Sequence, residues 1–92
     1  MDRPNGASIR MAVGQQVRNG RRAARLTQRE LAARIYRSTS WLRGVEQGRR
    51  EPTLPELAAI ASVLKIDWLQ MAAAALEVAR SPQGTAEPLP VR

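Results

Sequence analysis

Helix start signals recur along the middle of the chain and divide it into short helices. "TQRE", which begins at residue 27, and "TLPE", which begins at residue 53, each place a threonine three residues before a glutamate, as in a capping box. Ser38 or Thr39 can cap a helix between them, and Asp67 can cap a further one. With no strand pattern anywhere, the sequence predicts an all-α fold of five short helices.

The hydrophobic residues support one small helical domain. They make up 43% of the 92 residues, and much of that share is Ala and Leu, which are strong helix formers. We expect the folded part to span residues 9–80. Residues 1–8 and the proline-rich residues 81–92 lack a periodic apolar pattern, so we interpret them as a disordered lead and a disordered tail.

The absence of two residue types excludes several kinds of chemistry. The chain has no cysteine and no histidine, which rules out disulfides, thiolate zinc sites and Cys or Ser/His catalytic sets. Its carboxylates form no paired cluster apart from the capping positions. We therefore expect no enzyme, no cofactor and no metal. The longest apolar run, Met71 to Leu76, is far shorter than the ~20 residues of a membrane span, and we expect a soluble cytoplasmic protein that makes no membrane contact.

Positive charge is concentrated in the first half of the chain. The formal net charge is +7. Residues 10–50 hold eleven arginines and only two glutamates, whereas residues 51–92 are slightly acidic. A basic half of this kind is typical of a protein that binds a polyanion, although a solvated arginine-rich face is the alternative.

The third expected helix has two chemically distinct faces. At 100° per residue, Trp41, Leu42 and Val45 fall on one side and should face the core. The opposite side carries Ser40, Arg43, Gly44 and Gln47, with Thr39 at its edge. Glycine in a helix costs about 1 kcal/mol relative to alanine, so the gap at Gly44 suggests a helix whose outer face meets another molecule.

Several motifs together resemble a known family. "VGQQVR" with Arg21, then "TQRELA", then "VEQG" followed by a basic segment and a proline are similar to the helix-turn-helix of phage-repressor-type proteins, the Cro/C1 or XRE family. The similarity runs from about Val13 to Leu69. It implies a compact five-helix, lambda-repressor-like domain in which the helix-turn-helix covers about residues 27–48. The third helix would enter the major groove of double-stranded DNA.

The resemblance also implies roles for individual residues. The base-reading candidates are Thr39, Ser40, Arg43 and Gly44. The candidates for phosphate or backbone contacts are Gln28, Ser38, Gln47, Arg49 and Arg50. Arg21 and Glu46 occupy the positions of an internal salt bridge.

Two positions depart from the family pattern. The turn after the second helix usually holds glycine with a positive φ, but this chain has Tyr36. Either Tyr36 adopts a left-handed conformation or the turn is reshaped. Gly20 stands where a large apolar residue is usual, so the first helix should pack either more closely or less stably.

The fifth helix carries more apolar surface than one small domain needs. Its sequence "WLQMAAAALEVA" is apolar almost all round. We expect one stripe to close the domain, namely Leu69, Ala72, Ala73 and Leu76. The surplus face predicts a homodimer interface made by Trp68, Met71, Ala75 and Val78. Packing of Trp68 within the domain, with Met71 exposed, is the alternative.

These observations favour a sequence-specific DNA-binding transcriptional regulator, with repression as the more common role in the family and the nucleoid as its location. An alternative of another class is an antitoxin, an interaction protein that neutralises a partner protein and regulates its own promoter. The tail "SPQGTAEPLPVR" could bind that partner, and co-purification of a small protein would favour this alternative.

Overall fold

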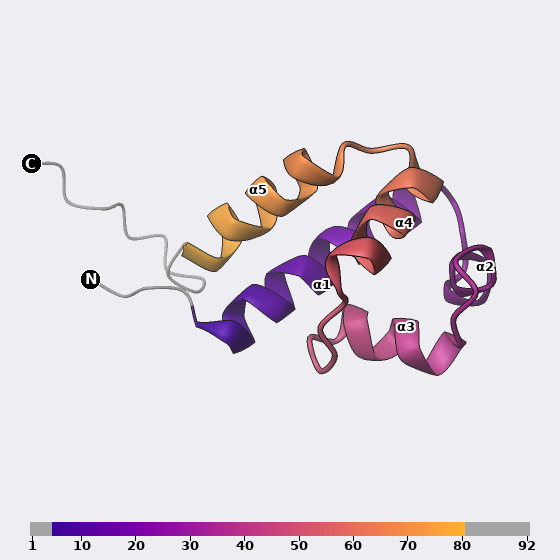
Figure 1. Cartoon of the computed structure of the whole chain (residues 1–92), viewed down its shortest axis with the longest axis horizontal. Helices are drawn as coiled ribbons and strands as arrows, with labels where there is room; N and C mark the ends of the chain where they lie inside the picture. Colours follow the sequence, from indigo (N-terminus) through magenta and orange to yellow (C-terminus); the bar gives the residue numbers. More distant parts are fainter. Residues whose placement is uncertain (1–4, 81–92) are drawn as a thin grey trace, which may run out of the picture.

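The computed structural model describes residues 5–80, which form five helices and, within that range, no strand. The helices in chain order are α1 (Gly6–Ala23), α2 (Gln28–Arg34), α3 (Thr39–Glu46), α4 (Leu54–Leu64) and α5 (Trp68–Arg80). α1 runs through the middle of the molecule, with α5 along one side and α3 across the other (Figure 1). The prediction of an all-α, five-helix fold is confirmed.

α1 begins earlier than the sequence suggested, because Asn5 caps it. The Asn5 side-chain oxygen accepts a hydrogen bond of 2.8 Å from the Ser8 backbone N–H, and the Ser8 hydroxyl accepts one of 3.1 Å from the Asn5 N–H. The helix therefore starts at Gly6 and not at Ile9, which corrects the expected boundary of the disordered lead. The expectations for residues 1–4 and for the tail at 81–92 fall outside the described residues.

The other helices start where their capping residues predict. Thr27 and Glu30 form a reciprocal capping box at α2, and Thr53 and Glu56 form another at α4. At α3 the Ser38 hydroxyl accepts a hydrogen bond of 3.0 Å from the Trp41 N–H, so Ser38 and not Thr39 is the cap.

The core lies where the first four helices converge. Its largest fully buried side chains come from each of them: Val17, Leu31, Leu42, Val45 and Ile60. The predicted inward face of α3 is confirmed, since Trp41, Leu42 and Val45 are all buried. The buried face of α4 consists of Leu57, Ile60, Ala61 and Leu64.

Two glycines let α1 approach its neighbours closely. A Cβ at Gly14 would lie 2.3 Å from the Val45 carbonyl oxygen and 2.9 Å from that of Glu46, so α1 crosses the end of α3 with its backbone almost in contact. A Cβ at Gly20 would lie 3.0 Å from Leu64 Cδ1. Of the two alternatives for Gly20, the structure shows the closer packing.

The structure reverses part of the division predicted for α5. Met71 and Ala75, assigned to the dimer interface, are 4% and 2% exposed and close the core. Leu69 and Leu76, assigned to the core, are 60% and 39% exposed. Because α5 is apolar almost all round, its periodicity alone could not select the buried face. Of the interface candidates, Trp68 and Val78 remain exposed at the surface.

α4 and α5 meet at a sharp bend. α4 ends at Leu64, and the residue that caps it, Lys65, has a left-handed backbone with φ 59°. The Asp67 carboxylate then accepts a hydrogen bond of 3.0 Å from the Leu69 N–H at the start of α5. Within residues 5–80 no single helix is both long and apolar enough to cross a membrane, and α4 and α5 reach that length and apolarity only as a pair bent by 109°.

Candidate nucleic-acid interface

The turn between α2 and α3 contains a tyrosine in an unusual backbone conformation. Tyr36 has φ 57°, so the left-handed alternative is the one the chain adopts. The Arg37 N–H donates to the Ala32 carbonyl oxygen at 2.9 Å, which closes the end of α2. The left-handed region costs a residue with a side chain roughly 1–2 kcal/mol, and the Tyr36 ring recovers none of this by packing because the residue is 93% exposed.

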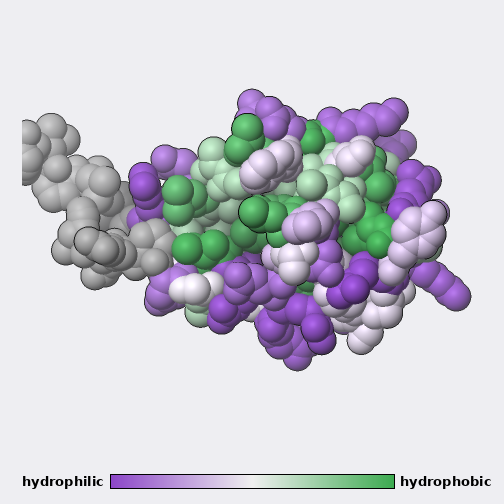
Figure 2. Space-filling model, viewed as in Figure 1, coloured by the Kyte–Doolittle hydropathy of each residue, from purple (hydrophilic) through white to green (hydrophobic). Residues whose placement is uncertain are grey.

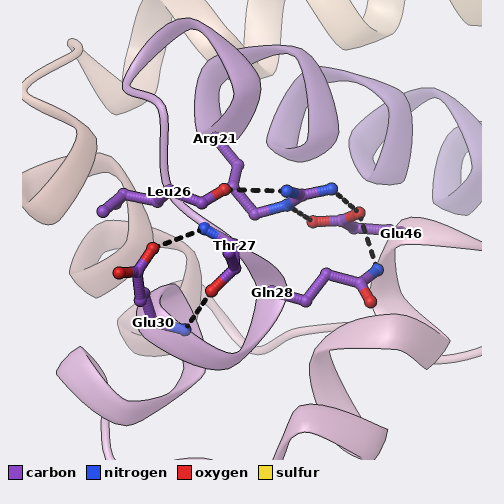
Figure 3. Close-up of polar contacts among 6 residues, drawn as sticks. All are labelled: Arg21, Leu26, Thr27, Gln28, Glu30 and Glu46. Carbon is purple, nitrogen blue, oxygen red and sulfur yellow. Dashed lines mark hydrogen bonds and ion pairs between the residues drawn. The ribbon is translucent and has the colours of Figure 1, made fainter.

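A partly buried ion pair joins α1 to the C-terminal end of α3 (Figure 3). Arg21 Nε lies 2.7 Å from Glu46 Oε2, and Arg21 Nη2 lies 3.0 Å from Glu46 Oε1. The third nitrogen, Nη1, donates to the Leu26 carbonyl oxygen at 2.8 Å. The hydrogen bonds to Glu46 raise the pKa of Arg21 despite the opposing effect of burial. The pair implied by the resemblance is thus present, and its contacts are internal.

Gln28, at the first position of α2, joins the same cluster. Its amide nitrogen donates to Glu46 Oε1 at 3.1 Å, and Figure 3 shows it reaching toward the carboxylate. Glu46 therefore connects α1, α2 and α3. The resemblance suggested only a phosphate contact for Gln28, so this internal bond was missed. The side chain has a second N–H and a carbonyl oxygen that remain for other partners.

The outward face of α3 presents polar side chains to solvent. Ser40, Arg43 and Gln47 are exposed, and Thr39 is half-buried. Within residues 5–80, the Arg43 guanidinium has no hydrogen-bond or ion-pair partner. Gln47 accepts a hydrogen bond from the Arg49 guanidinium. Among the described residues, this face therefore carries the unpartnered guanidinium of Arg43 beside the hydroxyl and amide groups of its neighbours.

Gly44 is the base-reading candidate that the structure corrects. It is buried, and the side chain of Arg50 covers it. A Cβ at Gly44 would lie 3.4 Å from Arg50 Cβ and 3.8 Å from Arg50 Nε. The gap that the sequence shows in the outward face is therefore filled by a residue of the following loop. Sequence periodicity could not show this, because the loop's path depends on the turn at Gly48, where φ is 74°.

A polar hollow of about 400 Å³ lies beside the start of α3. It is lined by Tyr36, Arg37, Ser38, Ser40, Trp41 and Arg50. Arg37 is held at its wall: its Nη2 lies 3.0 Å from Glu56 Oε2, and its guanidinium carbon lies 4.5 Å from the centre of a Trp41 ring. Sequence reasoning missed this role of Arg37. The spacing rule for helical neighbours could not have suggested it, because Arg37 lies before the cap of α3.

The face of the molecule drawn in Figure 2 differs in polarity between α3 and the last two helices. Hydrophilic residues line the edge of the molecule that α3 forms, while apolar residues gather over α4 and α5 (Figure 2). Arg43, Arg49 and Arg50 are all exposed at or just beyond α3. Because exposed arginines attract polyanions, the charge at this edge of the molecule favours such a partner for α3.

Comparison with known proteins agrees with this geometry. The helix-turn-helix domain family matches residues 12–74, which include all of α2, α3 and α4. The chain belongs to the helix-turn-helix domain family. In this family two helices joined by a short turn present the second helix to DNA, and here those helices are α2 and α3.

Two solved structures are similar to this helix-turn-helix protein. The clp gene regulator ClgR from Corynebacterium glutamicum is 28% identical with a TM-score of 0.74, over 77% of this chain and 76% of that chain. The restriction-modification controller protein C.AhdI from Aeromonas hydrophila is 31% identical with a TM-score of 0.64, over 67% of this chain and 94% of that chain. No curated protein matches the chain.

Proposed function

We propose that this helix-turn-helix protein is a sequence-specific regulator of transcription, acting as a repressor with α3 in the major groove of double-stranded DNA. The observation that carries the proposal is the division of α3 into two faces. Leu42 and Val45 are fully buried, whereas Ser40 and Arg43 are exposed. The major groove of B-DNA is about 12 Å wide and admits an α-helix, so the exposed face is the one that would meet base edges.

The proposed contacts follow from the side chains on that face. Arg43 can donate to guanine O6 and N7 together, and Ser40 and Thr39 carry hydroxyls that hydrogen-bond less selectively. Around them, Gln28, Ser38, Gln47 and Arg49 are proposed to contact the DNA backbone. Gln28 can do so while keeping its bond to Glu46, because one N–H of its amide remains.

The regulatory part of the proposal is supported by the similar structures. One is described as a clp gene regulator and the other as a restriction-modification controller protein. Repression is tested by placing a selected site in a promoter that drives a reporter gene. Expression of this chain should lower reporter output, and an increase would instead indicate activation.

Dimerisation is proposed through the exposed apolar residues of α5. These are Trp68, Leu69, Leu76 and Val78, which are between 37% and 60% exposed. A two-fold dimer would place two copies of α3 on half-sites about 34 Å apart on one face of the DNA. The interface differs from the one expected from the sequence, because Met71 and Ala75 are already covered by the domain's own core.

Selection of binding sites from a random duplex library, followed by titration across salt, tests DNA recognition. A recovered motif and an affinity that falls steeply with salt are expected. Arg43→Ala should lose the preference at one base position by about 1–3 kcal/mol. Arg80→Ala, at the end of α5, is the matched control and should leave the motif unchanged. Equal weakening of all sequences by Arg43→Ala would contradict its assignment as a base reader.

A further inference from the structure

The chain after α3 folds back over the helix that it leaves. The backbone N–H groups of Arg49 and Arg50 both donate to the Gly44 carbonyl oxygen, at 2.9 Å and 3.2 Å. The left-handed turn at Gly48 makes this return possible. As a result, the backbone places Arg50 directly against the outward side of α3, one turn after Ser40.

The Arg50 side chain lies along α3 and does not extend away from the end of the helix. Its Cβ, Cδ and Nε lie 3.4 Å, 4.0 Å and 3.8 Å from the position that a Cβ would occupy at Gly44. Arg50 also lines the polar hollow beside the start of α3, together with Ser40. The Arg50 side chain therefore lies where a side chain at position 44 would extend.

The guanidinium of Arg50 is also unengaged. Within residues 5–80 it has no hydrogen-bond or ion-pair partner. Its neighbours differ in this respect, because Arg49 donates to Gln47 and Arg37 pairs with Glu56. Among the residues that the structure describes, Arg50 and Arg43 are therefore the two arginines beside the outward face of α3 whose guanidinium groups have no partner.

We infer that Arg50 is a specificity-determining residue, which reads a guanine in the major groove from the position that Gly44 leaves open. The inference rests on the proposed function, because Arg50 enters the groove only if α3 does. When a helix binds in the groove, a side chain that is packed against its outward face lies close to the base edges. A side chain that contacts the phosphates at the rim of the groove would instead point away from the helix. The inference replaces the backbone contact that the resemblance implied for Arg50.

Binding-site selection with matched variants tests the inference. Arg50→Ala should lose the preference for one base pair by roughly 5- to 100-fold, at a position different from the one that Arg43→Ala affects. Arg50→Lys should lose the same preference while keeping affinity for unrelated duplex DNA, because lysine keeps the charge but not the two-pronged donor geometry. Arg49→Ala is the control that alters affinity without altering that position.

Two substitutions at Gly44 test the packing of Arg50 against α3. Gly44→Ala adds a Cβ at ordinary contact distance from Arg50, so the motif should persist. Gly44→Gln needs the space that the Arg50 side chain fills, and should change the preference at the base pair that Arg50→Ala affects. Thermal melting of each variant confirms that the domain is folded before its motif is compared.

The outcomes separate the inference from the proposed function. If Arg50→Ala weakens all sequences equally and Arg50→Lys restores binding, Arg50 is a phosphate contact and the inference is overturned while the proposed function stands. If the folded wild-type protein itself enriches no duplex sequence, the proposed function fails and the inference fails with it.

Discussion

Arg21 and Glu46 are 25 positions apart in the chain and meet through two parallel hydrogen bonds, of 2.7 Å and 3.0 Å. Their side chains are only 11% and 3% exposed. Glu46 is the last residue of α3, so the pair fixes that end of the helix against α1. Together with the buried side chains of α3, this contact positions the outward face of the helix.

Removal of one partner should destabilise the domain strongly. Glu46→Ala leaves the partly buried Arg21 guanidinium without its carboxylate. Loss of one partner of a fully buried pair costs about 3–5 kcal/mol of unfolding free energy, so we expect a loss of about 3 kcal/mol or less here. Urea denaturation measures it. Glu51→Ala is the matched control, since its pair with Arg10 is 3.7 Å long and Glu51 is 72% exposed; exposed pairs contribute about 0–1 kcal/mol. Similar losses in the two variants would contradict a structural role for Glu46.

The turn at Tyr36 should be improved by glycine. Tyr36→Gly relieves the left-handed conformation at a residue whose side chain makes no packing contribution. After the entropy cost of glycine in the unfolded chain is included, we expect the unfolding free energy to rise by about 0.5–1 kcal/mol. Ala33→Gly, at an exposed helical position nearby, is the control and should lose about 1 kcal/mol. Destabilisation by both changes would mean that the Tyr36 ring has a stabilising role.

The two faces of α5 should respond differently to substitution. Leu69→Glu places a charge on the exposed face, so it should weaken self-association, measured by sedimentation, and leave the melting of the monomer nearly unchanged. Met71→Ala removes a buried side chain and should lower the unfolding free energy by about 2–5 kcal/mol. A wild-type protein that stays monomeric at tens of micromolar would exclude the proposed dimer.

Acid should weaken the start of α2. The hydrogen bond from the Thr27 backbone N–H, with a smaller contribution from the Thr27 side chain, holds the pKa of Glu30 below its ordinary value of 4.5. A lowered pKa means that the stabilisation is present above pH 4.5 and is lost as the pH falls through the folded-state pKa. Glu30→Gln keeps an acceptor for Thr27 but does not titrate. Its unfolding free energy should therefore fall less steeply below pH 4.5 than that of the wild type; parallel curves would contradict the role of ionised Glu30.

Features that depend on nearby residues could be predicted from the sequence. The caps at Thr27 and Thr53 each involve residues three positions apart, and the buried face of α3 follows from its period. The Arg21–Glu46 pair is a long-range contact, and it was predicted only through the resemblance. The start of α1 was missed, although Asn5 and Ser8 have the spacing of a cap.

Features that depend on how distant segments meet could not be predicted. A helix that is apolar almost all round has several possible buried faces, so the position of Met71 was settled only by the packing of α5 on α1. The contact of Gly14 with the end of α3 depends on the crossing of two helices. The cover over Gly44 depends on the path of the next loop. No periodicity within one segment encodes these relationships.

The burial of half of α3 limits how this protein can evolve. Four of its eight residues, Trp41, Leu42, Gly44 and Val45, are buried. Substitution of Trp41, Leu42 or Val45, whose side chains form part of the core, would disturb folding before it changed recognition. Under the proposed function, adaptation to a new DNA site must then use the few exposed positions of α3 and the loop that covers it. A lineage of such proteins should therefore diversify fastest at positions 40, 43 and 50, while the rest of the helix stays nearly constant.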